Sequence, residues 1–180
     1  MKQMIYFVSI LLLAAACNNQ APVEEKAPVK AAINMADYPY TLDHAYKDWQ
    51  AGKQENAIMV LKMIKAWENK NTAECASYFA DEVEMNTDYV MAKMSRDSII
   101  SMLESSYKDI ASIKVDMQDW ESVVSADGKD EWVTLWYTQA ITDTNGTTDS
   151  VNVVNDAKIV NGKIAVFDEY VQHFPKNEKE

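Results

Sequence analysis

Apolar side chains change their spacing part-way along the chain, from the repeat of a helix to the repeat of a strand. Within residues 57–68, AIMVLKMIKAWE, they recur at the i, i+1, i+4 and i+7 positions of one helical face; these are Val60, Leu61, Ile64 and Trp67. Several other positions of this segment are apolar as well, and a helix this apolar is covered on most of its sides. The pattern therefore predicts a helix inside the fold.

Two further helices are predicted from their capping residues. Asn71, with Glu74 three positions later, is typical of a helix start, and the short helix that follows is expected to run into Phe79. Ser95 precedes a third helix over residues 96–108, whose apolar positions again share one face.

Beyond these helices the apolar repeat becomes two, which is the repeat of a β-strand. The dipeptides DG at 127–128, NG at 145–146 and NG at 161–162 are strong hairpin signals. They separate four runs, at about 113–124, 130–143, 149–160 and 163–173. In the first run Trp120 is out of phase with Met117, so a bulge near Gln118 and Asp119 is expected. Four strands joined by short turns form an antiparallel meander.

The order of helices followed by a meander predicts an α+β fold in which a curved sheet wraps around the helices and leaves a cone with an apolar interior. The folded domain is expected over residues 40–174, with a short tail at 175–180. All four prolines lie at its borders or outside it.

The first residues follow the plan of a secretory signal rather than of a domain. Lys2 precedes an apolar run that is too short to span a bilayer, and small residues lead to Cys17. The segment LAAAC resembles a bacterial lipobox, in which the cysteine carries lipid, although an incidental cysteine after an ordinary signal is the alternative. We therefore predict a signal peptide at 1–16, lipidation at Cys17, a disordered tether at 17–39, and a lipid-anchored protein of the periplasm or outer membrane.

Composition excludes several classes of function. The net charge of −11 and pI of about 4.6 disfavour nucleic acid as a partner. Two cysteines, two histidines and a single arginine, Arg96, cannot supply a disulfide framework or a zinc cluster, so we expect no metal and no cofactor. Cys75 is expected to be a small core residue.

The stretches AWENKNTAECASYFADEVEM and IVNGKIAVFDEY, in this order, resemble the SnoaL-like branch of the nuclear transport factor 2-like superfamily over about residues 55–173. The leader also resembles that of Bacteroidetes-type lipoproteins with this domain. The resemblance implies a cone of helices packed in a curved, mainly antiparallel sheet of four to six strands. It also implies either an enzyme, such as an isomerase, dehydratase, epoxide hydrolase or polyketide cyclase, or a domain that only binds or dimerises through the outer sheet face.

The catalytic positions of the ketosteroid isomerase branch are not matched. Alignment places Met63, Thr87 and Val154 where that branch keeps its tyrosine, its base and its acid. A shift of one residue would place Asp88 at the position of the base. Arg96, in the first turn of a predicted surface helix, is a poor candidate for the arginine of the epoxide hydrolase branch.

One pair of carboxylates is a candidate for acid–base chemistry. If the 161–162 turn pairs Val160 with Lys163, Asp156 faces Phe167, and Asp156 and Glu169 become diagonal neighbours on one face. By the resemblance this face lines the cone, where one of two close carboxyls would hold its proton. The alternative is that both carboxylates lie at the mouth, solvated and inert.

Large apolar side chains are candidates for the pocket lining. They are Met63, Trp67, Phe79, Trp132, Trp136, Phe167 and Val171. Aromatic residues at these spacings are also typical of plain core.

Three functions follow from these observations. The first is an envelope lipoprotein that binds a small apolar molecule or a protein partner without catalysis. The second is a SnoaL-like isomerase, dehydratase or hydrolase that uses Asp156 and Glu169, with Asp88 or His173 as a further group. The third is a structural module that forms a homodimer through the outer sheet face.

Overall fold

The computed structural model describes residues 34–175. The predicted signal peptide, Cys17, most of the predicted tether and residues 176–180 lie outside the described residues. Contacts divide the chain into a unit ending at Asp43 and a unit beginning at His44. In its described residues the first unit has one turn of 3-10 helix, Met35–Asp37. The second unit holds the sheet, the α-helices and the candidate site.

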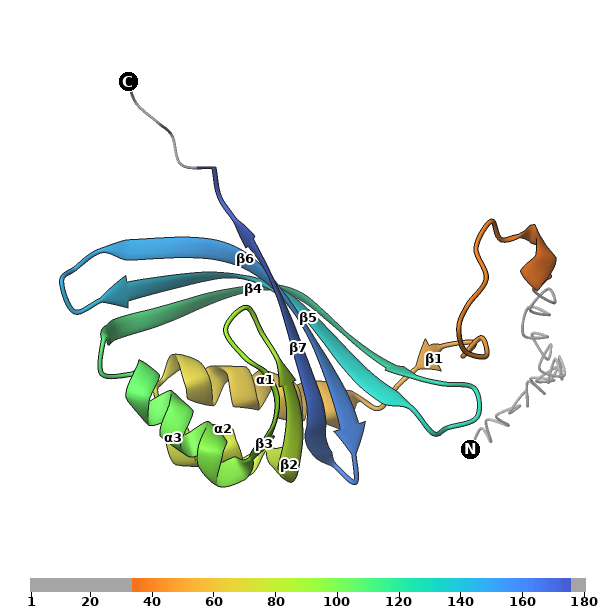
Figure 1. Cartoon of the computed structure of the whole chain (residues 1–180), viewed down its shortest axis with the longest axis horizontal. Helices are drawn as coiled ribbons and strands as arrows, with labels where there is room; N and C mark the ends of the chain where they lie inside the picture. Colours follow the sequence, from red (N-terminus) through yellow and green to blue (C-terminus); the bar gives the residue numbers. More distant parts are fainter. Residues whose placement is uncertain (1–33, 176–180) are drawn as a thin grey trace, which may run out of the picture. The chain divides into compact units, whose positions relative to one another are not determined.

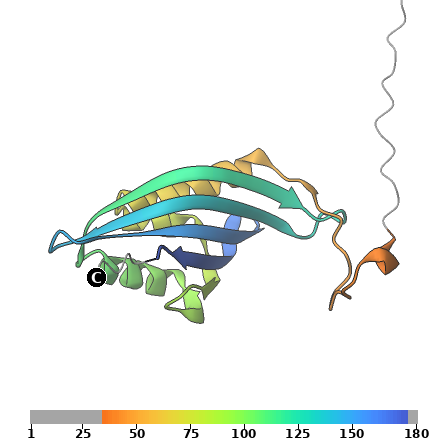
Figure 2. The same cartoon turned by 90° about the horizontal axis from the view of Figure 1, so that it is seen from above.

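A single curved sheet of seven strands forms one layer of the second unit, and three helices lie against one of its faces (Figures 1 and 2). The strand order is β1-β4-β5-β6-β7-β2-β3. The strands are β1 (Gln50–Ala51), β2 (Phe79–Asn86), β3 (Met91–Ser95), β4 (Ile110–Val124), β5 (Glu131–Asp143), β6 (Thr148–Val160) and β7 (Lys163–His173). The predicted α+β cone and its meander are confirmed, with three strands added to the four that the alternation predicts, so the sheet has seven strands and not four to six.

The glycine turns behave in two ways. At Asn161 and Gly162 both φ angles are positive, 52° and 70°, as a two-residue type I′ hairpin requires. Gly146 and Gly128 also have positive φ, but the asparagine and aspartate before them do not. The three hairpins are therefore confirmed, and only the last of them has a positive φ at both residues of its dipeptide.

Bulges in β4 and β7 change which side chains of these two strands face the helices. The predicted bulge is confirmed. Met117 pairs with Tyr137 and Asp119 pairs with Trp136, so Gln118 is the extra residue with no cross-strand pairing partner on β5. A second bulge lies in β7, where Ile159 pairs with Ile164 but Lys158 pairs with Val166, so Ala165 is the extra residue. Side chains alternate between the two faces of a strand. This extra residue therefore places every later side chain of β7 on the face opposite to the one that an unbroken register would give.

The helices are α1 (Gln54–Glu68), α2 (Thr72–Ser77) and α3 (Arg96–Ser106). Both predicted caps are present, since Asn71 accepts from the backbone N–H of Glu74 and Ser95 accepts from that of Ser98. None of these helices, within the described residues, has the length and apolarity needed to cross a membrane.

The prediction that the second helix runs into Phe79 is wrong. The helix ends at Ser77, and Phe79 is the first residue of β2, which pairs in parallel with β7 and antiparallel with β3. Phe79, Val83 and Met85 are buried within this strand. Its pairing with β7 depends on residues more than 80 positions away, so the local residue pattern contains little indication of it.

The inner face of the sheet, which faces the helices, carries the apolar core. On β6 the buried residues alternate with partly exposed ones; they are Val151, Val153, Asn155, Ala157 and Ile159. Val60, Met63 and Ile64 of α1 belong to the same core, and so does Cys75, whose thiol is free and buried as predicted. The intervening residues of β6 lie on the opposite, outer face.

Candidate functional site

A pocket of about 280 Å³ opens on the inner face near the end of the β5–β6 hairpin. The strands β5, β6 and β7 and the β2–β3 loop supply its walls. The lining residues are Asp88, Tyr89, Gln139, Ile141, Asp143, Thr147, Asp149, Val151, Glu169, Val171 and His173.

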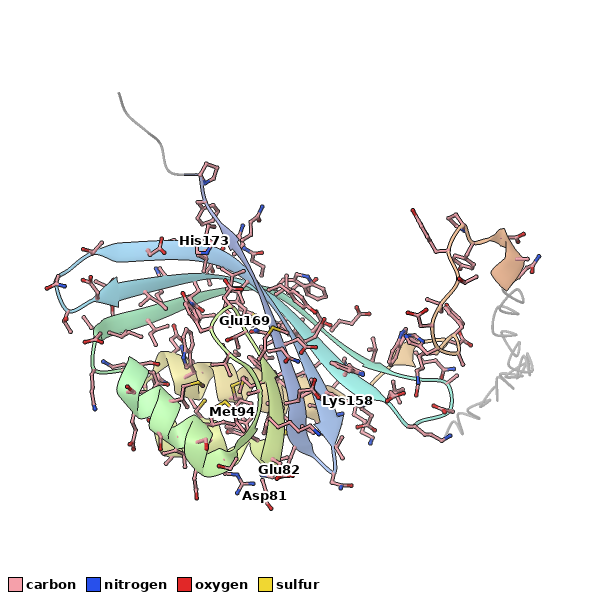
Figure 3. All side chains as sticks on the ribbon, viewed as in Figure 1. Asp81, Glu82, Met94, Lys158, Glu169 and His173 are labelled. Atoms are coloured by element: carbon pink, nitrogen blue, oxygen red, sulfur yellow. The ribbon has the colours of Figure 1, made fainter. Side chains whose placement is uncertain are left out.

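Cross-strand pairing arranges the pocket in rows. Gln139 pairs with Val151, and Val151 pairs with His173, so these three form one row across the sheet. Glu169 lies four residues before His173 on β7, which separates their Cα atoms by about 13 Å. Figure 3 shows both on β7, with His173 near the end of the strand and Glu169 further inside. Glu169 and His173 thus stand at different depths.

Glu169 is a partly buried carboxyl of the pocket. Its Oε2 accepts a long hydrogen bond of 3.5 Å from Nδ2 of Asn155, its cross-strand partner. Burial raises the pKa of Glu169 and the charge of Asp88 raises it further, while the hydrogen bond from Asn155 lowers it. Burial favours the neutral form because a carboxylate is poorly solvated there. Glu169 therefore holds its proton to higher pH than a solvated glutamate.

Asn155 is held in turn by Tyr137. The two side chains are 0% and 2% exposed, and the Tyr137 hydroxyl donates to Oδ1 of Asn155 at 2.8 Å. Since Oδ1 accepts from the phenol, the amide Nδ2 is directed toward Glu169. Burial raises the pKa of Tyr137 well above its ordinary value, and the charge of Glu169 adds to this, so the phenol keeps the proton that it donates. The three residues form a polar chain inside an apolar core.

The β2–β3 loop brings Asp88 and Tyr89 to the pocket. Thr87 orders this loop, because its Oγ1 accepts from the backbone N–H groups of Tyr89 and Val90, both at 3.2 Å. Tyr89 is 90% exposed at the mouth. The fold thus brings together Asp88 and Glu169, two of the three carboxylates that the sequence singled out.

No family model matches the chain, and no curated protein matches it. Solved structures do match, at identities that show the fold alone. AclR from Streptomyces galilaeus, a proposed hydroxylase, is 15% identical with a TM-score of 0.54, covering 69% of this chain and 83% of its own. An LEH-like epoxide hydrolase of M. tuberculosis is 15% identical with a TM-score of 0.53, covering 66% and 84%.

A third neighbour is a ketosteroid isomerase-like fold protein from Catenulispora acidiphila, solved in complex with trimethylamine. It is 17% identical with a TM-score of 0.52, covering 62% of this chain and 83% of its own. A Burkholderia pseudomallei neighbour, 15% identical with a TM-score of 0.54, is itself described as nuclear transport factor 2-like and covers 66% and 91%. The fold is nuclear transport factor 2-like.

The predicted pairing of Asp156 with Glu169 inside the nuclear transport factor 2-like cone is wrong. Asp156 pairs with Asp168 and lies on the outer face, where its Oδ1 accepts from the Thr134 hydroxyl at 2.5 Å. The bulge at Ala165 is the cause, because it shifts the register by one residue between the turn and Asp156. Asp156 therefore lines a separate outer-face pocket with Trp49, Trp132 and other residues.

The apolar candidates also lie in different parts of the fold. Val171 lines the inner pocket. Met63, Phe79 and Phe167 are buried in the core, where the two phenylalanine rings make an edge contact with centroids 6.0 Å apart. Trp67 is partly buried against that core.

Trp132 and Trp136 are not part of the cone interior, contrary to expectation. They alternate with the buried inner-face residues of β5 and so lie on the outer face. The ammonium of Lys158 lies 5.8 Å from the ring centre of Trp132. A strand that is apolar on both faces does not reveal which face points inward.

The catalytic positions of the isomerase branch remain unmatched. Met63 is core, Thr87 orders a loop, and Val154 lies on the outer face, with Asn155 next to it facing inward. Arg96 donates to the carbonyl of Phe79 at 2.9 Å and pairs with Asp81, so it joins α3 to β2.

Several polar residues of the site were missed from the sequence, among them Tyr137, Asn155 and Gln139. The first two are in phase with buried apolar neighbours on β5 and β6, which is the signal that identifies an inward polar residue. Within residues 34–175, no group of three histidine, cysteine or carboxylate side chains is placed to hold a metal.

Proposed function

We propose that the domain is an enzyme that moves a proton on a small molecule, with Glu169 as its general acid or base. The observation that carries the proposal is the position of this carboxyl, partly buried in a pocket and hydrogen-bonded by Asn155. Burial raises its pKa toward the range where a carboxyl exchanges protons readily at neutral pH. Isomerisation, dehydration and hydrolysis all need such a group.

The surrounding residues have separate tasks in this proposal. The amide of Asn155, fixed by Tyr137, reaches the carboxyl through a long hydrogen bond and supports its charged form. Asp88 at the mouth opposes that charge and so favours the protonated form. Burial and Asp88 thus favour the protonated form of Glu169, and Asn155 favours its charged form.

The comparisons support an enzyme as a class. The neighbours described as a hydroxylase and as an epoxide hydrolase have this fold, although fold alone does not carry an activity to this chain. Binding of an apolar molecule without catalysis has less support, because the inner pocket carries several carboxylates. The vacant isomerase positions at Met63 and Val154 argue only against that one chemistry.

The test is a turnover assay of the full-length chain with enone, epoxide and β-hydroxy carbonyl substrates. Glu169→Gln removes the titrating proton while it keeps the shape of the side chain. Glu121→Gln on the outer face is the matched control, and Asp156→Asn tests the residue that the sequence had favoured.

We expect turnover in the wild type and in both outer-face variants, and a loss of about 10²–10⁴-fold in Glu169→Gln. Turnover that survives Glu169→Gln, or no turnover in any protein, would contradict the proposal. Tight ligand binding without turnover would instead support a binding protein.

We also propose that lipid on Cys17 holds the enzyme at the cell envelope. Support comes from the charged, apolar and small-residue plan that ends at Cys17. A homodimer through the outer sheet face remains a further proposal.

A further inference from the structure

We infer that the outer-face pocket is a binding site for a neutral sugar ring, held between two tryptophan side chains and a row of polar side chains. The site lies on the opposite face of the sheet from Glu169, so it is separate from the proposed function and does not rest on it. The volume of the pocket, about 480 Å³, is within the range of roughly 300–1,000 Å³ that small-molecule sites have.

Trp49 forms one wall of this pocket and is held there by the backbone around it. The next residues, Gln50 and Ala51, pair with β4, and the carbonyl of Lys47 accepts the backbone N–H of Ala126 at 2.9 Å. The indole is nevertheless 42% exposed. A large aromatic side chain that is fixed at a pocket wall without being buried is placed to contact a ligand through its ring.

Trp132 forms a second aromatic wall. The ammonium of Lys158, which Figure 3 labels, lies 5.8 Å from the centre of this ring and pairs with Asp130 at 2.7 Å, so the ring is held from one side. Neither the indole N–H of Trp49 nor that of Trp132 has a hydrogen-bond partner among residues 34–175. An indole N–H only donates, so each tryptophan offers a donor as well as an aromatic face.

A row of polar side chains supplies the acceptors. Glu121, Thr134, Asp156 and Asp168 are cross-strand partners in turn, on β4, β5, β6 and β7. Two of the carboxylates are half used: Oδ1 of Asp156 accepts from the Thr134 hydroxyl, and Oδ1 of Asp168 accepts from Nδ2 of Asn86 at 2.8 Å. Their Oδ2 atoms have no partner within the described part of the chain. Each can accept a further hydrogen bond.

The combination of aromatic faces, donors and acceptors decides the class of ligand. An anion would be repelled by the three carboxylates. A cation without oxygen atoms could accept nothing from the two indole N–H groups, and a hydrocarbon would leave the polar row unpaired. A sugar ring presents C–H groups to an aromatic face, and its hydroxyl groups both donate and accept. It therefore satisfies the walls and the polar row together.

The test is calorimetric titration of the full-length chain with methyl β-D-glucopyranoside at neutral pH, in low and in high salt. Each comparison probe keeps a ring and changes one property. Glucuronate adds a negative charge, cyclohexylamine is a cation without hydroxyl groups, and cyclohexanol has a single hydroxyl group. Sedimentation velocity at the same protein concentration reports whether a homodimer forms.

Three variants locate the binding. Trp49→Ala removes the exposed wall, and Trp49→Phe keeps an aromatic face without the N–H. Trp120→Ala is the matched control, because Trp120 is 47% exposed and pairs with Leu135, whose side chain is buried on the opposite, inner face.

We expect the glucoside to bind more tightly than the three other probes, with an affinity that does not change with salt, because the ligand is neutral. Trp49→Ala should weaken binding by about 3- to 10-fold, as the loss of one aromatic contact implies. Trp49→Phe should weaken it less, and Trp120→Ala should leave it unchanged.

Three results would overturn the inference. One is wild-type affinity for the glucoside in Trp49→Ala. The second is tighter binding of cyclohexylamine that falls steeply as salt rises, which would show a general attraction of cations instead. The third is no glucoside binding, and a dimer in sedimentation would then identify a second copy of the chain as the occupant of this face.

Discussion

Tyr137→Phe tests the buried polar chain on which the candidate site depends. The change removes one hydroxyl and leaves the Oδ1 of Asn155, a residue with no exposed surface, without its donor at 2.8 Å. Leaving a buried acceptor unsatisfied costs about 1–3 kcal/mol. For a domain of this size the melting temperature should fall by roughly 3–5 °C for each kcal/mol. Chemical denaturation, with thermal melting as a second probe, measures the loss.

A double-mutant cycle shows whether the cost comes from this hydrogen bond. Asn155→Leu removes the acceptor, and with Tyr137→Phe it replaces both polar partners by apolar groups, so the double variant should lose less than the sum of the two single losses. Tyr170→Phe is the control, because Tyr170 is 60% exposed. A Tyr137→Phe variant within about 0.5 kcal/mol of the wild type, or strictly additive losses, would refute the buried chain.

Three further predictions concern other parts of the chain. Burial raises the folded-state pKa of Glu169, so the stability that its protonated form contributes is fully present below the unfolded-state pKa and is lost as pH rises through the folded-state pKa. As pH rises from about 4 to about 8, Glu169→Gln should therefore gain stability relative to the wild type in thermal melts. Melting temperatures of the two proteins that change in parallel with pH would contradict this. Gly162→Val should lower stability by about 1 kcal/mol or more, because a φ of 70° disfavours a residue with a side chain. A Cβ at this position would have no neighbour within 4 Å, so the cost would come from the backbone and not from a clash. An unchanged melting temperature would contradict this. Cys17→Ala should lose the diacyl modification by mass spectrometry and leave the membrane fraction, whereas a wild type without lipid would refute the anchor.

Local patterns in the sequence were sufficient for much of the fold. The helical repeat predicted α1, two caps predicted α2 and α3, and three glycine turns with alternating residues predicted the meander β4–β7. The bulge at Gln118 was also predictable, because apolar residues on its two sides are out of phase. Each of these features depends on residues that are neighbours in the chain.

The site was predictable only in part. Asp88, Glu169 and Val171 were singled out and do line the inner pocket. Their surroundings depend on Asn155, and nothing in the sequence marked that residue as functional. Asp156 was placed in the pocket by a register counted from the 161–162 turn, and that count failed after a few residues.

The physical reason is the bulge at Ala165. In β7 the residues around it, IAVF at 164–167, are apolar at consecutive positions, so an extra residue does not disturb any visible alternation. Only packing of β7 between β6 and β2 decides which of these side chains faces the helices. The sequence by itself determined that Glu169 follows a hairpin and stands on a strand. The tertiary structure decided that Glu169 faces inward beside Asn155 while Asp156 faces outward, because a shift of one residue moves every later side chain to the opposite face.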